Sequence, residues 1–145
     1  MTIYTIGFTR RSAEEFFETL KDAKVDRVID VRLNNVSQLA GYSKKDDLRY
    51  FLRNLAGIDY RHELSLAPTP EMLEAYRAKK VTWAKYEPRF RALLTERGVE
   101  KTLDRKLFAG KPVLLCSEFQ PEHCHRRIVA EYLVEKWGAR KIVHL

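Results

Sequence analysis

The sequence has few of the features that mark secreted, membrane-spanning or disulfide-stabilised proteins. Its 145 residues contain only two cysteines, Cys116 and Cys124, and its unbroken apolar runs are only a few residues long. A helix that crosses a bilayer needs about 20 consecutive apolar residues. The opening residues, MTIYTIGFTRRS, lack the basic and then apolar pattern of a secretory signal. We therefore expect a soluble, cytoplasmic protein with no membrane partner, in which the cysteines are free thiols.

The composition is that of a single folded domain with a basic surface. Hydrophobic residues make up 45% of the chain and aromatic residues 11%, which is enough for one core of ordinary size. The 27 Lys and Arg residues outnumber the 20 Asp and Glu residues, for a net charge of +7. This excess favours an anionic partner, either an anionic small molecule such as a nucleotide, or a nucleic acid. A dispersed, solvated surface explains the same charge, because the basic residues occur in short pairs along the whole chain.

Strand-like and helix-like patterns alternate along the chain. Short runs of β-branched and other apolar residues predict strands at 2–7, 26–32, 58–61, 112–116 and 140–145. Capping signals and apolar residues at helical spacing predict helices that begin near Ser12, Ser43 and Glu122. Strands separated by helices predict an α/β fold: one Rossmann-like domain over residues 1–145, with a mainly parallel sheet flanked by helices on both faces.

A helical insertion at about 70–108 interrupts this alternation. Thr69 followed by Pro70 is a typical helix start, with the threonine as N-cap and the proline at the first helical position. Apolar residues then recur at helical spacing up to Phe108. The pair Glu87-Pro88 predicts a break or restart inside this region, because a proline disfavours helical backbone in the residue before it.

The carboxyl ends of the predicted strands gather polar and reactive residues. In a parallel sheet these ends lie at one edge, and ligands bind in the crevice beyond them. The residues that the sequence places there include Gly7, Arg10, Asp30, Arg32, Cys116 and Glu118. Asp30 and Arg32 are two apart on a strand and face the same side of the sheet. They can form an ion pair with each other, or Arg32 can reach an anion above the sheet edge.

The segment CSEFQPEHCHRR, residues 116–127, carries the densest set of reactive residues. We expect Cys124 in the first turn of the helix that begins near Glu122, where the helix dipole and neighbouring cationic side chains favour a thiolate. Cys124, and with less support Cys116, is therefore a candidate nucleophile. The remaining candidates are Glu118 and His125 for proton transfer, Arg126 with Arg32 and Arg10 for anion binding, and His123, Asp30 and Gly7 for positioning.

Other interpretations of this segment stay open. Cys124 and His125 each lie four residues before an apolar residue, so both can pack against the sheet as core groups. Several residues of the segment are metal-ligand types, but Cys-x7-Cys is not a usual zinc spacing, and neighbouring residues on a helix point about 100° apart. We therefore assign no metal site. A redox pair of Cys116 and Cys124 is a further alternative, although the sequence has no Cys-x-x-Cys motif.

Four short motifs resemble one known family. They are TIGFT (5–9), DVR (30–32), GIDYRH (57–62) and LLCSEFQPEHCHR (114–126). Together they are similar to the Domain of Unknown Function 488 family, and to its subgroup with NNVSQLAGYSK after DVR, over essentially the full length. The resemblance implies the family's fold and points to the same cysteine, histidine and arginine residues. It implies no activity and no cofactor, because the family name assigns none.

These observations give one leading hypothesis and two alternatives. The leading hypothesis is a cysteine-dependent enzyme that places an anionic substrate, such as a phosphate-bearing molecule, a nucleotide or a nucleic-acid component, at the carboxyl edge of the sheet. The first alternative is a non-catalytic module that binds nucleic acid or nucleotides through its positive charge, with cysteines that only pack. The second alternative is a metal-stabilised domain that binds a partner.

Overall fold

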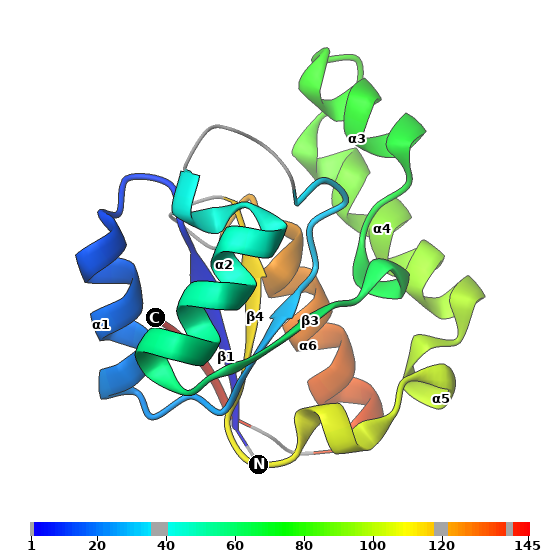
Figure 1. Ribbon diagram of the computed structural model, residues 1–145. Coiled ribbons are helices and arrows are strands. Elements are labelled where there is room, and N and C mark those ends of the chain that lie inside the picture. The colour runs from blue at the N-terminus through cyan, green and yellow to red at the C-terminus, as the bar shows by residue number, and fades with distance from the viewer. Residues whose placement is uncertain (1, 36–40, 118–121, 139–140) are drawn as a thin grey trace.

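A five-stranded parallel sheet forms the centre of the protein (Figure 1). The computed structural model describes residues 2–35, 41–117, 122–138 and 141–145. The strands, in chain order, are β1 (Thr2–Gly7), β2 (Arg27–Asp30), β3 (Asp59–His62), β4 (Pro112–Cys116) and β5 (Lys141–His144). Their order across the sheet is β3-β2-β4-β1-β5, and every pairing is parallel. The predicted α/β fold with a parallel sheet is therefore confirmed.

Strand β4 is the central strand, and its sequence explains why. All five residues of PVLLC are buried. In the parallel register Val113 lies between Tyr4 of β1 and Val28 of β2. A strand that is covered on both faces needs a continuous apolar run rather than an alternating one. The predicted bounds of β1 and β4 are the observed ones.

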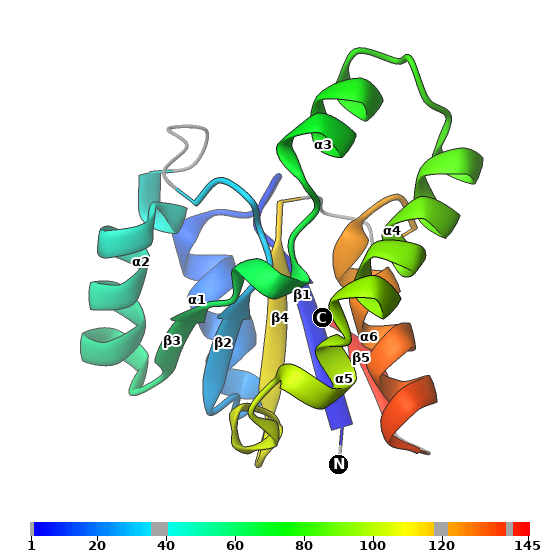
Figure 2. The ribbon, with the colours of Figure 1, turned by 90° about the vertical axis from the view of Figure 1, so that its right-hand side faces the viewer.

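One face of the sheet is covered by the helices that follow β1 and β2, as Figure 2 shows. They are α1 (Ala13–Asp22), α2 (Lys45–Phe51) and η2 (Leu52–Ala56), a π-helix that continues α2 directly. The hydrophobic core on this face is built around the buried side chains of Phe16 and Leu48.

The other face carries the helices of the second half of the chain. They are α4 (Trp83–Arg97), α5 (Val99–Thr102) and α6 (His125–Trp137), with Phe90 and Ile128 in the core that they enclose. None of the helices in the described part of the chain is long and apolar enough to cross a membrane. The remaining helices are α3 (Pro70–Arg77), η1 (Gly41–Ser43), η3 (Leu64–Leu66) and η4 (Arg105–Phe108).

Helix ends follow the capping signals in the sequence. The Ser12 side chain accepts a hydrogen bond of 3.1 Å from the backbone N–H of Glu15, and the Thr69 side chain accepts one of 3.2 Å from the N–H of Met72. Both bonds satisfy N–H groups that the first helical turn leaves unpaired. Gly57 ends the α2–η2 helix with a φ of 65°, a left-handed conformation that glycine adopts without strain.

The break predicted at Glu87-Pro88 is wrong. Helix α4 runs through Pro88, and the chain turns instead between α3 and α4, where Lys79 has a φ of 60°. A proline inside a helix costs about 3 kcal/mol, because one backbone hydrogen bond is lost. Tyr86, Phe90 and Leu94 are all buried at helical spacing, and burial of each such side chain contributes about 1.5–3 kcal/mol. Core packing therefore outweighs the local preference.

The chain reverses its direction across the sheet between β1 and β4. From β1 it continues toward β2 on one side, and from β4 it continues toward β5 on the other. Such a point leaves a crevice beyond the strand ends, where ligands bind in open α/β sheets. Gly7 and Cys116, the last residues of β1 and β4, are register partners there. In Figure 2 the hairpin of α3 and α4 rises above this edge of the sheet.

Removing buried volume from β4 is expected to destabilise the whole fold. Leu114 is fully buried, whereas Leu55 on η2 is 62% exposed. We expect Leu114→Ala to lower the free energy of unfolding by about 2–5 kcal/mol, because it leaves a cavity. The matched control Leu55→Ala should lower it by less than about 0.5 kcal/mol. Urea unfolding followed by circular dichroism measures both, and equal losses would contradict the central position of β4.

Candidate functional site

Cys116 is brought to the carboxyl edge of the sheet by the buried strand that it ends. It is only 3% exposed, yet its side chain borders a cavity of about 110 Å³. Its register partner Gly7 ends the neighbouring strand. The thiol therefore lies at the reversal point of the sheet, where the fold leaves room for a ligand.

His125 lies against Cys116 in an orientation that the backbone fixes. It is the first residue of α6, and both of its ring nitrogens lie 3.4 Å from Cys116 Sγ. Its Nε2 is also 2.8 Å from the carbonyl oxygen of Val31. A carbonyl oxygen only accepts hydrogen bonds, so Nε2 carries a proton and donates it. Nδ1 is then free to exchange a proton with the thiol, which is the arrangement of a nucleophile and its base.

Cys124 lies one residue before α6, so the predicted helix start near Glu122 is wrong. Its backbone is extended, with φ −134° and ψ 136°, and it is the N-cap of the helix. The offset of about 100° between neighbouring helical residues therefore does not apply to Cys124 and His125. The Sγ atoms of Cys116 and Cys124 and a ring nitrogen of His125 lie within 4.8 Å of one another. We call these three side chains the thiol cluster, and their sulfur and nitrogen atoms are ligand types that zinc accepts.

The two thiols differ in proton affinity. Burial alone would raise the pKa of Cys116, but hydrogen bonds from the Cys124 thiol and from the backbone of Ser117, with the charge of Arg126, bring that pKa below its ordinary value. Burial, together with the hydrogen bond and charge of Cys116, raises the pKa of Cys124 well above its ordinary value. A thiolate therefore forms first on Cys116, which reverses the preference drawn from the sequence.

The cavity beside the thiol cluster has a cationic lining. Arg32 reaches it from the loop after β2 and Arg77 from the end of α3, and His123 lies at the entry to α6. The described residues that line the cavity include no Asp or Glu. Arg32 is paired with Asp30, but no ion pair of Arg77 is found among the described residues, so the lining favours a ligand with negative charge.

Aromatic side chains of the α3–α4 hairpin form one wall of this cavity. The Trp83 ring stacks on Tyr86 on one side, at 5.2 Å and 24°, and on His123 on the other, at 5.2 Å and 21°. Tyr76 lies against both Trp83 and Tyr86. The wall is flat and apolar, so it can pack against a planar or apolar part of a ligand.

The hydroxyl of Tyr86 is a site group that sequence reasoning missed. Helical spacing indicated only that Tyr86 belongs to the core, and the residue is 2% exposed. Tyr86 lines the cavity, and its buried hydroxyl has no hydrogen-bond partner in the described part of the chain. Burial raises the pKa of Tyr86, and the nearby Cys116 and Cys124 raise it further. The phenol therefore keeps its proton, as a buried donor close to the two thiols.

Arg32 combines an ion pair with access to the cavity. Its Nε and Nη2 each lie 2.8 Å from an oxygen of Asp30, and Nη2 also donates to the carbonyl of Ser43 at 2.7 Å. The second oxygen of Asp30 accepts a hydrogen bond from Tyr60 at 2.5 Å. Among the described residues no hydrogen bond uses Nη1 of Arg32. Arg32 can therefore keep its ion pair with Asp30 while its Nη1 contacts an anion.

Arg126 and Arg10, two other predicted site residues, are not among the described residues that line the cavity. Arg126 is fully buried and acts on the pKa of Cys116 through its charge, but it is not among the described lining residues. Arg10 is exposed on the loop after β1 and is not among them either. Glu118 lies outside the described residues. Arg77, which no motif indicated, lines the cavity from the end of α3.

Comparison with known proteins gives a family match over most of the chain. The model of the family described as Domain of unknown function DUF488 matches residues 12–133. Searches of curated proteins and of solved structures gave no match. The matched region contains Asp30, Arg32 and the whole thiol cluster.

Alkylation rates will distinguish the two thiols. We expect iodoacetamide at neutral pH to modify Cys116 first, because the pKa of Cys116 is lowered and the pKa of Cys124 is raised. The rate should rise with pH as the thiolate forms. The midpoint of that rise should lie below the pKa of an ordinary cysteine, which is about 8.5. Mass spectrometry of peptides alkylated at a series of pH values measures the site and the midpoint.

Three variants control this experiment. Cys116→Ser should abolish the fast reaction, because the remaining thiol has the raised pKa. Cys124→Ala removes a hydrogen-bond donor and should move the Cys116 midpoint to higher pH, whereas Cys124→Ser keeps a hydroxyl donor and should move it less. Preferential modification of Cys124, or an unchanged Cys116 midpoint in Cys124→Ala, would contradict the lower pKa of Cys116.

Proposed function

Because the chain belongs to the Domain of unknown function DUF488 family, whose name assigns no activity, we propose a function from the geometry of its site. The protein is a cysteine-dependent enzyme that acts on an anionic substrate. The observation that carries this proposal is the 3.4 Å contact between Cys116 Sγ and His125 Nδ1, with the imidazole held by the Val31 carbonyl. A thiol beside an oriented imidazole at the edge of a cavity is suited to nucleophilic catalysis.

In the proposed reaction Cys116 forms a covalent intermediate. Its thiol proton moves to Nδ1 of His125, and Sγ bonds to an electrophilic atom of the substrate. The bond from that atom to its leaving group breaks, and the leaving group departs with the electron pair and takes the proton from Nδ1. Water then bonds to the same atom, passes one proton to Nδ1, and releases the Cys116 thiolate, which takes that proton back.

The cavity lining supports an anionic substrate with a planar or apolar part. Arg77 supplies positive charge, Arg32 supplies an Nη1 donor that its pair with Asp30 does not use, and Trp83 supplies a flat apolar surface. Tyr86 also lines the cavity, next to Trp83. Guanidinium groups bind phosphate and carboxylate oxygens well. A nucleotide or a similar phosphate-bearing molecule has the matching features.

The charge preference of the site can be measured before any substrate is known. Iodoacetate is an anion and iodoacetamide is neutral, and both alkylate the same thiolate. We measure the ratio of the iodoacetate rate to the iodoacetamide rate, at Cys116 and at the free thiol of N-acetylcysteine, at the same pH and salt concentration. We expect this ratio to be severalfold higher at Cys116, because the cavity is cationic. Stopped-flow or quenched alkylation assays of the whole protein measure both rates.

Two arginine variants control this ratio. Arg77→Gln removes a charge that lines the cavity and should lower the ratio. Arg89→Gln removes a charge from an exposed residue of α4 outside the described lining and should leave the ratio unchanged. An equal change in both variants, or a protein ratio no higher than that of N-acetylcysteine, would contradict an anion-binding site.

A second function is favoured by one specific observation. The three ligand atoms of the thiol cluster lie within 4.8 Å of one another, and the second ring nitrogen of His125 donates to a backbone carbonyl. Metal-binding histidines usually make such a hydrogen bond with the nitrogen that does not bind the metal. The cluster could hold Zn²⁺ through Cys116, Cys124 and His125, which would make it a metal site of a partner-binding domain.

Metal analysis separates these two functions. For the enzyme we expect the purified protein to contain far less than one zinc per chain and Cys116 to react without added chelator. One zinc per chain, with alkylation of Cys116 only after chelation, would favour the metal site instead. Cys124→Ala gives an independent test, because it removes a ligand of the metal but leaves the Cys116–His125 pair in place. Inductively coupled plasma mass spectrometry and the Co²⁺ charge-transfer spectrum measure metal binding.

A further inference from the structure

A second cavity, of about 230 Å³, lies at the open edge of the sheet formed by β3. Four arginines line it: Arg27, Arg49, Arg53 and Arg61. The only carboxylate in its described lining is that of Asp59. None of the described residues that line it also lines the cavity beside the thiol cluster. We call this second site the arginine cavity.

Two of these arginines have acidic neighbours. Arg27 Nη2 lies 3.7 Å from an oxygen of Asp59, and its Nη1 donates to the carbonyl of Leu107 at 3.0 Å. Arg61 Nε lies 3.7 Å from an oxygen of Glu63. Exposed pairs at this distance are weak, contributing about 0–1 kcal/mol, and are screened by salt. Their guanidinium groups can therefore turn toward a stronger anion.

Arg49 and Arg53 have no ion pair with any residue in the described part of the chain. They are four residues apart on the α2–η2 helix, where like charges repel each other. The helix changes from α to π at Leu52, between the two arginines. Short π-helical turns occur frequently at functional sites. A bound anion would relieve the repulsion that the free protein retains.

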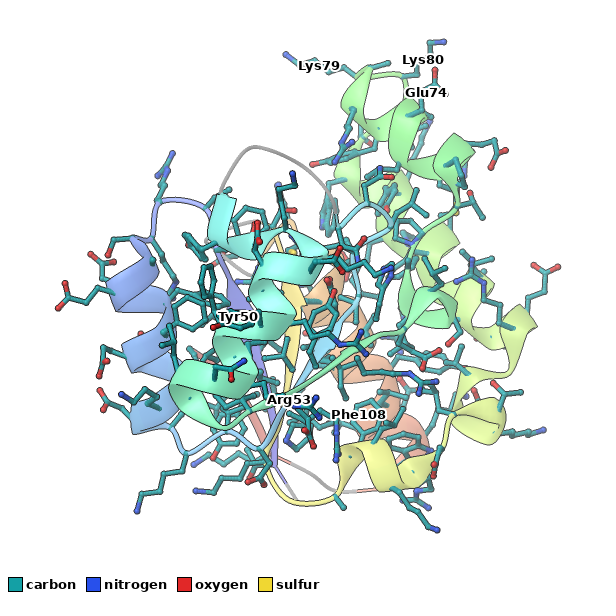
Figure 3. All side chains as sticks on the ribbon, viewed as in Figure 1. Tyr50, Arg53, Glu74, Lys79, Lys80 and Phe108 are labelled. Carbon is teal, nitrogen blue, oxygen red and sulfur yellow. The ribbon has the colours of Figure 1, made fainter. Side chains whose placement is uncertain are left out.

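An exposed aromatic ring lies on the same helix as these two charges, three residues before Arg53. Tyr50 follows Arg49 on the same helix and is 61% exposed. In Figure 3 Tyr50 and Arg53 are labelled on this one helix. An aromatic side chain of this size usually turns its ring into the core. Proteins that bind a single strand combine a cationic groove for its phosphates with aromatic rings on which its bases stack.

We propose that the arginine cavity and Tyr50 bind single-stranded nucleic acid, with phosphate groups in the cavity and a base stacked on the Tyr50 ring. Guanidinium groups pair with two phosphate oxygens at once. A single strand presents phosphates and unpaired bases together, which a duplex does not. This site is separate from the thiol cluster, and the inference does not depend on the proposed function.

The test compares two double variants of the whole protein. The test variant, Arg49→Gln with Arg53→Gln, removes two charges from the arginine cavity. The control variant, Lys79→Gln with Lys80→Gln, removes two charges from the exposed turn between α3 and α4. Figure 3 labels these two lysines at the far end of the molecule. Fluorescence anisotropy with a short labelled thymidine or uridine homopolymer measures affinity across a salt series. We expect the arginine variant to bind about tenfold more weakly, with the slope of log K against log salt reduced by about 1.4, or 0.7 for each lost phosphate contact. The lysine variant should bind as the natural protein does.

The role of the ring is tested at Tyr50 itself. Tyr50→Leu keeps apolar bulk but loses the aromatic face, and we expect it to weaken binding about tenfold with the salt slope unchanged. Tyr50→Phe keeps the face and should retain the affinity. Thermal melting checks that each variant is folded, which is expected because Tyr50 and both arginines are exposed.

Three results would overturn the inference. Equal losses in the two double variants would mean that only net charge matters. Displacement of the oligonucleotide by inorganic phosphate at the same phosphate concentration would identify a site for free phosphate. Equal competition by polyglutamate would identify a surface for acidic peptides.

Discussion

The bidentate ion pair between Asp30 and Arg32 fixes the carboxyl edge of the sheet, and the candidate site depends on it. Val31 lies between the two paired residues. Its N–H donates to the carbonyl of Leu115 in β4 at 3.1 Å, and its own carbonyl accepts the hydrogen bond of His125. The pair therefore holds the backbone that orients the imidazole. Such a buried pair adds little net stability, but loss of one partner costs about 3–5 kcal/mol, so its main effect is to fix geometry.

Features that depend on neighbouring residues could be predicted from the sequence. The apolar run 112–116 predicted a buried strand with the observed bounds, and Ser12 and Thr69 marked helix starts through their own side-chain chemistry. The rule that ligands bind at the carboxyl ends of parallel strands led to Cys116 and Arg32, which both line the cavity. These inferences required the topology of the sheet but no knowledge of side-chain contacts.

Features that depend on distant contacts could not be predicted in this way. The Val31 carbonyl that holds His125 comes from a residue 94 positions earlier in the chain. Helix α4 continues through Pro88 because its core packing outweighs the tendency of proline to break a helix. The pKa of Cys116 is lower than that of Cys124 because the Cys124 sulfur donates the hydrogen bond between them. The buried hydroxyl of Tyr86 leaves no trace in the periodicity of the sequence, because helical spacing identifies a face of a helix but not the position of one oxygen atom.

The small size of the cavity beside Cys116 limits which substrates the proposed enzyme could accept. Sites that enclose a complete drug-sized ligand usually measure about 300–1,000 Å³, whereas this one measures about 110 Å³. In the proposed function, a cavity of this size would take only the terminal group of a larger molecule, beside Arg32 and Cys116. The proposed enzyme would then select substrates by that terminal group and not by their length, so a short metabolite and a long polymer with the same end would bind alike.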